Sequence, residues 1–292
     1  MIPSDFSYTR PTSVAEALRL LGQPGVMPLA GGQSLIPMLT DRSVAASLLV
    51  DISRLADLRH VTVTTERVSI GGAATLGAAM TAGVAAACPL LVEVLHSVGT
   101  TAIRNRGTLI GNLVRASPNS ELPVVAVALG GVLVLRSTVG ERSVEAHAFF
   151  RGPHASAVEP GELVTELRIP LNPASPVAGG FAEVVARAGA PPLCCVAVCL
   201  RVDASGLIEH ARIVAGGIAG VPARCDGREA AMIGYPASEA IERLSGAITA
   251  LQPSTALPEA AYALDVLPVL IRRAAIRALS HLTMFTTGEP SA

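Results

Sequence analysis

Two short glycine-bearing segments hold the residues best suited to binding chemistry. The first, Pro28 to Pro37 (PLAGGQSLIP), sets Gly31 and Gly32 among other small residues, so little side-chain bulk surrounds its backbone N–H groups. Consecutive exposed main-chain amides form a concave site for a phosphate or pyrophosphate. Glycine pairs also mark tight turns, and the segment matches neither the P-loop nor the GxGxxG fingerprint. Alone, it leaves a turn and an anion site as alternatives.

The second segment, Ile103 to Pro123 (IRNRGTLIGNLVRASPNSELP), combines small residues with hydroxyl, amide and guanidinium groups. The residues concerned are Arg104, Arg106, Gly107, Thr108, Gly111 and Asn112. Two such segments can hold one extended diphosphate from both sides. The two arginines can reach a phosphate, or they can be solvated or contact a partner chain.

These motifs, AGGQSLIP followed by IRNRGT, GN and SPxxxLP, resemble the FAD-binding medium subunit of the molybdenum hydroxylases, the family of carbon monoxide dehydrogenase and xanthine dehydrogenase. The resemblance runs through nearly the whole chain. It implies an α+β fold in which two subdomains hold noncovalent FAD between them, of the vanillyl-alcohol-oxidase-like type, followed by a C-terminal three-stranded sheet with helices. It also implies molybdopterin and 2Fe-2S clusters on large and small partner subunits.

The resemblance also implies roles for individual residues. Diphosphate contacts would come from Leu29, Ala30, Gly31, Gly32, Gln33 and Ser34, and from Thr108, Gly111 and Asn112 on the other side. Glu121 stands where the family has an aspartate that accepts hydrogen bonds from the flavin's sugar hydroxyls. Val98 and Val164 stand where apolar residues lie beside the isoalloxazine, although both fit equally well as core valines. No side chain of this chain is implied as an acid, base or nucleophile.

Three places depart from the family pattern. Ile110 occupies the position of a glycine, and a β-branched residue does not easily adopt positive φ, so we expect the second segment to be remodelled there. Glu183 stands near the place of a lysine that lies close to the flavin. The run Ala188 to Pro192 lacks an aspartate and an aromatic residue often found there. Together they predict altered redox tuning of the flavin, or a divergent relative.

Apolar periodicity and turn residues predict three units that position these segments. Residues 1–57 are expected to form FAD-binding subdomain 1, residues 58–172 subdomain 2, and residues 178–286 a sheet-plus-helix domain. A linker is expected at 171–180. Expected helices are Ser13–Leu21, Leu76–Ala87, Leu90–Ser97, Pro123–Leu129, Ala237–Leu251 and Ala261–Leu279. Expected strands are Val26–Leu29, Leu48–Ile52, Val61–Val63, Arg67–Ile70, Val132–Leu135, Leu163–Ile169, Phe181–Arg187, Leu193–Val202 and His210–Val214.

Composition excludes several classes of function. The formal net charge of -1, from 22 basic and 23 acidic residues, gives no field that attracts nucleic acid or an anionic membrane. With 3% aromatic residues, base stacking is not expected either. The N-terminal segment lacks the pattern of a secretory signal, and the apolar stretches are too short and broken to span a membrane, so we expect a cytoplasmic protein.

The five cysteines are expected to be reduced thiols. Cys194, Cys195 and Cys199 suggest a metal site by composition, but adjacent residues on a strand face opposite ways, so core packing is the favoured interpretation. The histidines show no metal-binding spacing. We therefore expect no metal in this chain, with any iron–sulfur cluster on a partner.

The favoured interpretation is an FAD-binding electron-transfer subunit of a molybdopterin-dependent hydroxylase or dehydrogenase. It would pass electrons from iron–sulfur clusters on a partner chain to a final acceptor. One alternative is a stand-alone FAD-dependent oxidoreductase that acts directly on a small organic substrate, which the departures at Ile110, Glu183 and Ala188 to Pro192 support. Another is a flavin-less assembly or scaffold protein.

Overall fold

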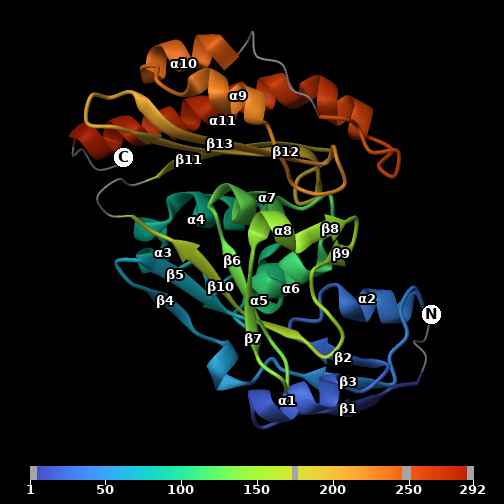
Figure 1. Ribbon diagram of the computed structural model, residues 1–292. Coiled ribbons are helices and arrows are strands. Elements are labelled where there is room, and N and C mark those ends of the chain that lie inside the picture. Colours follow the sequence, from blue (N-terminus) through green and yellow to red (C-terminus); the bar gives the residue numbers. More distant parts are fainter. Residues whose placement is uncertain (1–4, 173–176, 245–250, 288–292) are drawn as a thin grey trace.

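A computed structural model describes residues 5–172, 177–244 and 251–287. Within these ranges the elements form a small N-terminal lobe, a central region, and a C-terminal sheet that lies over the central region with helices on its outer side (Figure 1). The cavities described below lie where the N-terminal lobe meets the central region.

The N-terminal lobe is a three-stranded parallel sheet in the order β1-β3-β2. Its elements are β1 (Ser7–Thr9), α1 (Val14–Leu21), β2 (Val26–Leu29), α2 (Leu35–Thr40) and β3 (Leu48–Asp51). The predicted first helix is confirmed, with Ser13 as its N-cap, since the Ser13 hydroxyl accepts from the Glu16 N–H at 3.2 Å. The first glycine-bearing segment joins β2 to α2, at the carboxyl end of the parallel strands.

The central region contains a five-stranded sheet in the order β4-β5-β10-β6-β7, with helices packed on it. Its strands are β4 (Val61–Val63), β5 (Arg67–Gly71), β6 (Val132–Arg136), β7 (Glu141–Glu145) and β10 (Leu163–Pro170). The short turn η1 (Ala56–Leu58) precedes β4, and a two-stranded sheet of β8 (Phe150–Gly152) and β9 (Ala155–Ser156) follows β7. The helices are α3 (Ala82–Ala87), α4 (Pro89–Ser97), α5 (Thr101–Arg106), α6 (Leu109–Arg115), α7 (Glu121–Ala128) and α8 (Ala146–Phe149).

The expected helix at 76–87 is wrong in its first half. The helix begins only at Ala82, capped by Thr81, while the preceding residues bind the second glycine-bearing segment. The Leu76 N–H donates to the Gly107 carbonyl at 2.9 Å, and the Gly77 N–H donates to the Arg104 carbonyl at 3.0 Å. These long-range hydrogen bonds override a local apolar pattern that fits a helix.

Helix α7 is buried over its whole length, which confirms the expected buried helix. The C-terminal sheet covers it, and Arg212 from that sheet donates to the carbonyls of Val127 and Ala128 at 3.2 Å each. A guanidinium group at a helix C-terminus satisfies free carbonyls and complements the helix dipole. Arg212 therefore fixes the C-terminal domain to the central region.

The C-terminal domain is a four-stranded antiparallel sheet with three helices on its outer face. Its elements are β11 (Ala178–Val185), β12 (Pro192–Val202), β13 (Ile208–Gly216), β14 (Ala223–Arg224), α9 (Asp226–Met232), α10 (Ala237–Leu244) and α11 (Ala260–Thr287). The three expected strands are present, and the two-residue β14 adds a short fourth. Residues 245–250 of the expected helix at 237–251 lie outside the described residues.

Both faces of this sheet are buried, which explains why its strands read as continuous apolar runs. Cys195 and Cys199 pack with the central region, whereas Cys194 packs with the α11 side. The expectation that adjacent cysteines face opposite ways is therefore confirmed. All five cysteines are buried and unpaired, and burial raises the pKa of Cys194 and Cys199 to about 12.

The expected linker ends earlier than proposed, because Gly179 and Gly180 belong to β11. A Cβ on Gly179 would lie 2.7 Å from the Leu90 side chain of α4, and one on Gly180 would lie 2.1 Å from the Ala274 carbonyl of α11. These glycines let β11 pass closely between two helices rather than supplying flexibility.

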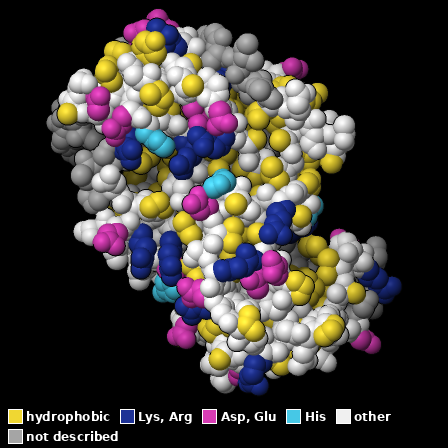
Figure 2. Space-filling view, viewed as in Figure 1, with side chains coloured by type: hydrophobic (Ala, Val, Ile, Leu, Met, Phe, Trp, Pro, Cys, Tyr) yellow, Lys and Arg dark blue, Asp and Glu magenta, His cyan; other side chains and the backbone are white. Residues whose placement is uncertain are grey.

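None of the described helices is both long and apolar enough to cross a membrane. Basic and acidic side chains are interspersed over the face shown in Figure 2, in keeping with the nearly balanced charge of the sequence.

Candidate cofactor-binding site

A cavity of about 670 Å³ lies between the N-terminal lobe and the central region. Such a volume is within the range of small-molecule sites. Ten of the twelve sequence-predicted site residues line it: Ala30, Gly31, Gly32, Gln33, Ser34, Val98, Thr108, Gly111, Asn112 and Val164. Leu29 lines a second, smaller cavity, and Glu121 lines neither.

The first segment presents an uninterrupted run of backbone donors at this cavity. Among the described residues, the N–H groups of Gly31, Gly32, Gln33 and Ser34 have no hydrogen-bond partner. Gly32 adopts a φ of +72°, which allows the chain to turn from β2 into α2. Consecutive free amides around such a turn form an anion-binding concavity.

The two segments touch through their backbones. A Cβ on Gly31 would lie 2.2 Å from the Arg106 carbonyl oxygen and 2.7 Å from the Gly107 Cα. The absence of a side chain at Gly31 is thus required by the contact between the segments. The contact fixes the position of the free amides of the first segment relative to the second.

The second segment is mostly helical. The Thr108 hydroxyl caps α6 by accepting from the Gly111 N–H at 3.1 Å, and a Cβ on Gly111 would lie 2.6 Å from that hydroxyl oxygen. Ile110 lies within α6, is buried, and is not among the described non-glycine residues with positive φ. The expectation that Ile110 remodels the segment through a positive-φ requirement is therefore wrong, because a helical position accepts a β-branched residue.

Asn112 is oriented by a buried neighbour. The Ser120 hydroxyl donates to the Asn112 Oδ1 at 2.9 Å, and Ser120 is 5% exposed. This hydrogen bond occupies the amide oxygen, so the amide NH₂ remains as a donor at the cavity. Ser120 was absent from the sequence-based site, and its position eight residues after Asn112 offered no signal.

Glu121 is the first residue of α7, directly after Ser120, and is buried. Burial, together with the nearby Glu183 carboxyl, raises the pKa of Glu121 to about 7, against a hydrogen bond from its own backbone N–H. Glu183 pairs with Cys195 in the sheet, and burial raises its pKa as well. Within the described residues, the Glu183 Oε2 is buried without a hydrogen-bond partner. Two carboxyl groups from different domains thus meet next to the cavity wall.

Val98 and Val164 are both core residues and cavity-lining residues. Arg104 holds the turn after Val98, because its guanidinium group donates to the carbonyls of His96, Val98 and Gly99 at 2.9 to 3.2 Å. Arg104 is therefore structural. Arg106 is exposed and lines the smaller cavity.

Sequence reasoning missed the far wall of the larger cavity, which residues 154–163 provide together with Arg115. Here Ala116 and His154 both adopt positive φ, and the His154 N–H donates to the Ala116 carbonyl at 2.8 Å. Non-glycine residues in this conformation are held there by their surroundings. The stretch contains one proline and one glycine, Pro160 and Gly161, which mark a turn but not the cavity that it borders.

The donor set suits an organic cofactor with a diphosphate. The site offers free amides, the Thr108 hydroxyl and the Asn112 amide beside buried valines, which match a phosphate group next to an apolar ring system. In the part of the chain that the structure describes, no three His, Cys, Asp or Glu side chains are grouped so that they could hold a metal ion.

Comparison with known proteins places this fold and cavity in a family. Residues 4–172 match the model of the FAD binding domain in molybdopterin dehydrogenase, and residues 180–278 match that of the CO dehydrogenase flavoprotein C-terminal domain. The chain is 36% identical over 236 residues to the glyceraldehyde dehydrogenase medium chain of Sulfolobus acidocaldarius, covering 80% of this chain and 83% of the relative. It is 32% identical over 286 residues, 96% of each chain, to subunit alpha of the 6-hydroxypseudooxynicotine dehydrogenase complex of Paenarthrobacter nicotinovorans.

A solved structure of carbon monoxide dehydrogenase from Hydrogenophaga pseudoflava superimposes with a TM-score of 0.88 at 30% identity, covering 96% of this chain and 99% of the matched chain. The protein belongs to the FAD-binding medium subunits of the molybdenum hydroxylases. It is a subunit of an FAD-dependent oxidoreductase, as the resemblance in the sequence had implied.

Proposed function

We propose that this chain binds FAD in the larger cavity and transfers electrons to a final acceptor after they arrive from iron–sulfur clusters on a partner chain. The observation that carries the proposal is the run of four free backbone N–H groups at the cavity. The diphosphate would bind to these amides, with Thr108 and Asn112 on the other side. The flavin supplies the electron chemistry, and the protein supplies binding, orientation and electrostatics.

The buried carboxyl pair is proposed to tune the flavin's surroundings. Glu121 directly follows Ser120, which holds Asn112 at the cavity, and the Glu183 carboxyl is near enough to raise the pKa of Glu121. A neutral Glu121 can donate as well as accept a hydrogen bond, and an ionised one adds negative charge that disfavours an anionic reduced flavin. The protonation state of this pair would thus alter the flavin's potential.

Partner chains require a docking surface, and we place it on α11. Tyr262, Val269 and Ile276 recur at seven-residue intervals and are 46%, 52% and 46% exposed. Residues seven apart lie on one face of a helix, so these side chains form an apolar stripe. The named relatives are medium chains or subunits of complexes, which supports a large or small subunit as the occupant.

The first test is an absorbance spectrum of the purified chain, with identification of the cofactor released on unfolding. A flavin spectrum with released FAD supports the proposal. A colourless chain that takes up no added FAD would contradict it and favour a scaffold role.

The second test is expression together with candidate large and small subunits. Stable co-purification with molybdenum and iron is expected, whereas an isolated chain that oxidises a small substrate unaided would favour the stand-alone oxidoreductase. Val269→Glu should abolish co-purification while leaving FAD bound. Val139→Glu is the matched control, because Val139 is 96% exposed and lies outside α11.

A further inference from the structure

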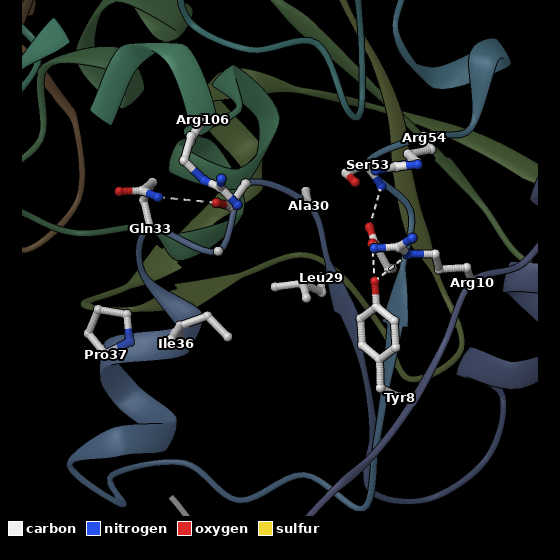
Figure 3. A pocket seen from close by; sticks show the side chains of 13 residues that line it. Tyr8, Arg10, Leu29, Ala30, Gln33, Ile36, Pro37, Ser53, Arg54 and Arg106 are labelled. Carbon is white, nitrogen blue, oxygen red and sulfur yellow. Dashed lines mark hydrogen bonds and ion pairs between the residues drawn. The ribbon is translucent and has the colours of Figure 1, made fainter. Parts of the chain in front are cut away.

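A second cavity, of about 570 Å³, also borders the first glycine-bearing segment (Figure 3). The two cavities share residues 30–33 and otherwise have different linings. The smaller one sits at the carboxyl ends of β1, β3 and β2, which provide Arg10, Asp51 and Leu29. In open sheets of parallel strands, this edge is where ligands bind.

Positive charge in this cavity exceeds negative charge. The negative charge of Asp51 is already paired within the cavity wall. The Arg10 Nε lies 3.3 Å from the Asp51 Oδ2, and the Tyr8 hydroxyl donates to the same oxygen. Burial favours the neutral form of Asp51, but hydrogen bonds from Ser53 and Tyr8 outweigh burial and lower its pKa. The carboxylate therefore stays ionised and paired with Arg10. The Asp51 charge is therefore not available to other cations.

Arg54 and Arg106 supply the excess positive charge of the smaller cavity. Both are exposed, both line the cavity, and among the described residues neither has a hydrogen-bond or ion-pair partner. In Figure 3, Arg106 and Gln33 lie on one side of Ala30 and Arg54 lies on the other. Two unpaired guanidinium groups around one hollow suit a phosphate or carboxylate, which each can bind through two N–H groups.

The remaining wall is apolar. Leu29, Ile36 and Pro37 lie below the guanidinium groups in Figure 3, and Ile36 is 41% exposed. A ligand that fills this hollow therefore needs an apolar or aromatic part next to its anionic group. The volume is within the range of small-molecule sites.

We propose that this smaller cavity binds a second ligand, a mononucleotide-sized molecule with phosphate groups at Arg54 and Arg106 and a ring against Ile36. The site is separate from the FAD cavity but shares its first segment. The proposal goes beyond FAD binding, because it concerns side chains that do not line the larger cavity.

The test is a calorimetric titration of the FAD-saturated chain with ADP and, separately, with inorganic pyrophosphate. One ADP per chain should bind without releasing FAD, and pyrophosphate should bind more weakly. Arg54→Ala and Arg106→Ala should each weaken the binding of both ADP and pyrophosphate by about tenfold. This is the effect expected from the loss of one charge-assisted hydrogen bond. Ile36→Ala should weaken ADP binding but not pyrophosphate binding. Arg59→Ala is the control, since Arg59 is exposed and lies outside the cavity.

Three results would overturn the proposal. The first is that neither probe shows saturable binding. The second is that each ADP bound releases one FAD, which would place ADP in the larger cavity. The third is co-purification of a partner chain that depends on Arg54 and Arg106 while neither probe binds, which would assign the arginines to a protein contact. If the chain binds no FAD at all, the same titration of the apo chain and its variants still decides between these outcomes.

Discussion

The first and second glycine-bearing segments border the same cavity but use their polar groups in opposite ways. The groups concerned lie in residues 30–34 of the first segment and residues 108–120 of the second. Within the described ranges, the first segment leaves four backbone N–H groups without partners, and it relies on glycine for its shape. In the second segment, two hydroxyl groups form hydrogen bonds within the segment. The Thr108 hydroxyl caps α6, and the Ser120 hydroxyl donates to Asn112. The first segment therefore offers backbone donors directly, whereas the second uses hydrogen bonds among its own residues to position the donor that it keeps at the cavity, the Asn112 amide.

The largest effect is expected at the contact between the segments. Gly31→Ala places a Cβ 2.2 Å from the Arg106 carbonyl oxygen, so the backbones must separate. We expect loss of FAD binding and a decrease of about 2–3 kcal/mol in the free energy of unfolding, measured by flavin content and urea denaturation. Gly140→Ala is the control, because nothing lies within 4 Å of its Cβ position. Wild-type FAD affinity in Gly31→Ala would show that the segments need not touch.

The next effect is a pH dependence that originates at Glu121. Its pKa of about 7 in the folded chain exceeds its ordinary value of 4.5, so the folded state binds more protons than the unfolded state. The free energy of unfolding should therefore decline as pH rises from about 4.5 to 7, by about 3 kcal/mol in total. Glu121→Gln should reduce this decline, measured by denaturation at pH 5 and pH 8.

Exposed Glu66→Gln provides the comparison for Glu121→Gln and should leave the pH profile unchanged. Glu183 and Cys195 also face this group, and Glu183 adds to the same trend. An identical pH slope in wild type and Glu121→Gln would show that Glu121 does not titrate in this window.

A smaller effect is expected from the helix cap. Thr108→Ala removes the acceptor for the Gly111 N–H and should cost about 1 kcal/mol of stability together with FAD affinity. Thr81→Ala removes the equivalent cap of α3, at 3.2 Å from the Val84 N–H, and should reduce stability without changing FAD affinity. Equal effects of the two changes on FAD affinity would mean that Thr108 has no local role at the cavity.

The smallest effect tests the positioning of Asn112. Ser120→Ala should weaken FAD binding by about threefold to tenfold, the value of one hydrogen bond. In the Asn112→Ala background the same change should have no further effect, because Ser120 acts through Asn112. Additive losses in this double-mutant cycle would refute the coupling.

The sequence predicted the elements better than the contacts between them. Apolar periodicity located α1, and continuous apolar runs located α7 and the strands of the C-terminal sheet, since these patterns are local. The run at 76–81 has the same appearance but hydrogen-bonds to the second segment, and no local pattern reveals a partner so distant in sequence. For the same reason the sequence did not show that Gly31 lies against Gly107 of the second segment.

The site was predicted in outline only. The motifs identified ten residues that line the larger cavity, whereas Glu121 is buried outside its lining. Strand alternation places Glu183 on the face that carries Phe181, but the sequence does not show that α7 packs against that face. Residues 154–163 escaped notice because turn residues alone do not indicate which cavity a loop borders.

The position of α11 in the sequence has a consequence for biosynthesis. This helix follows every strand of the sheet that it covers, so the face that carries Val196, Val198 and Leu200 has no helical cover from α11 while those strands leave the ribosome. The central region, whose last strand ends at Pro170, can fold earlier and offer a surface for the opposite face of the sheet. During synthesis, therefore, the C-terminal sheet is the part of this chain most exposed to aggregation.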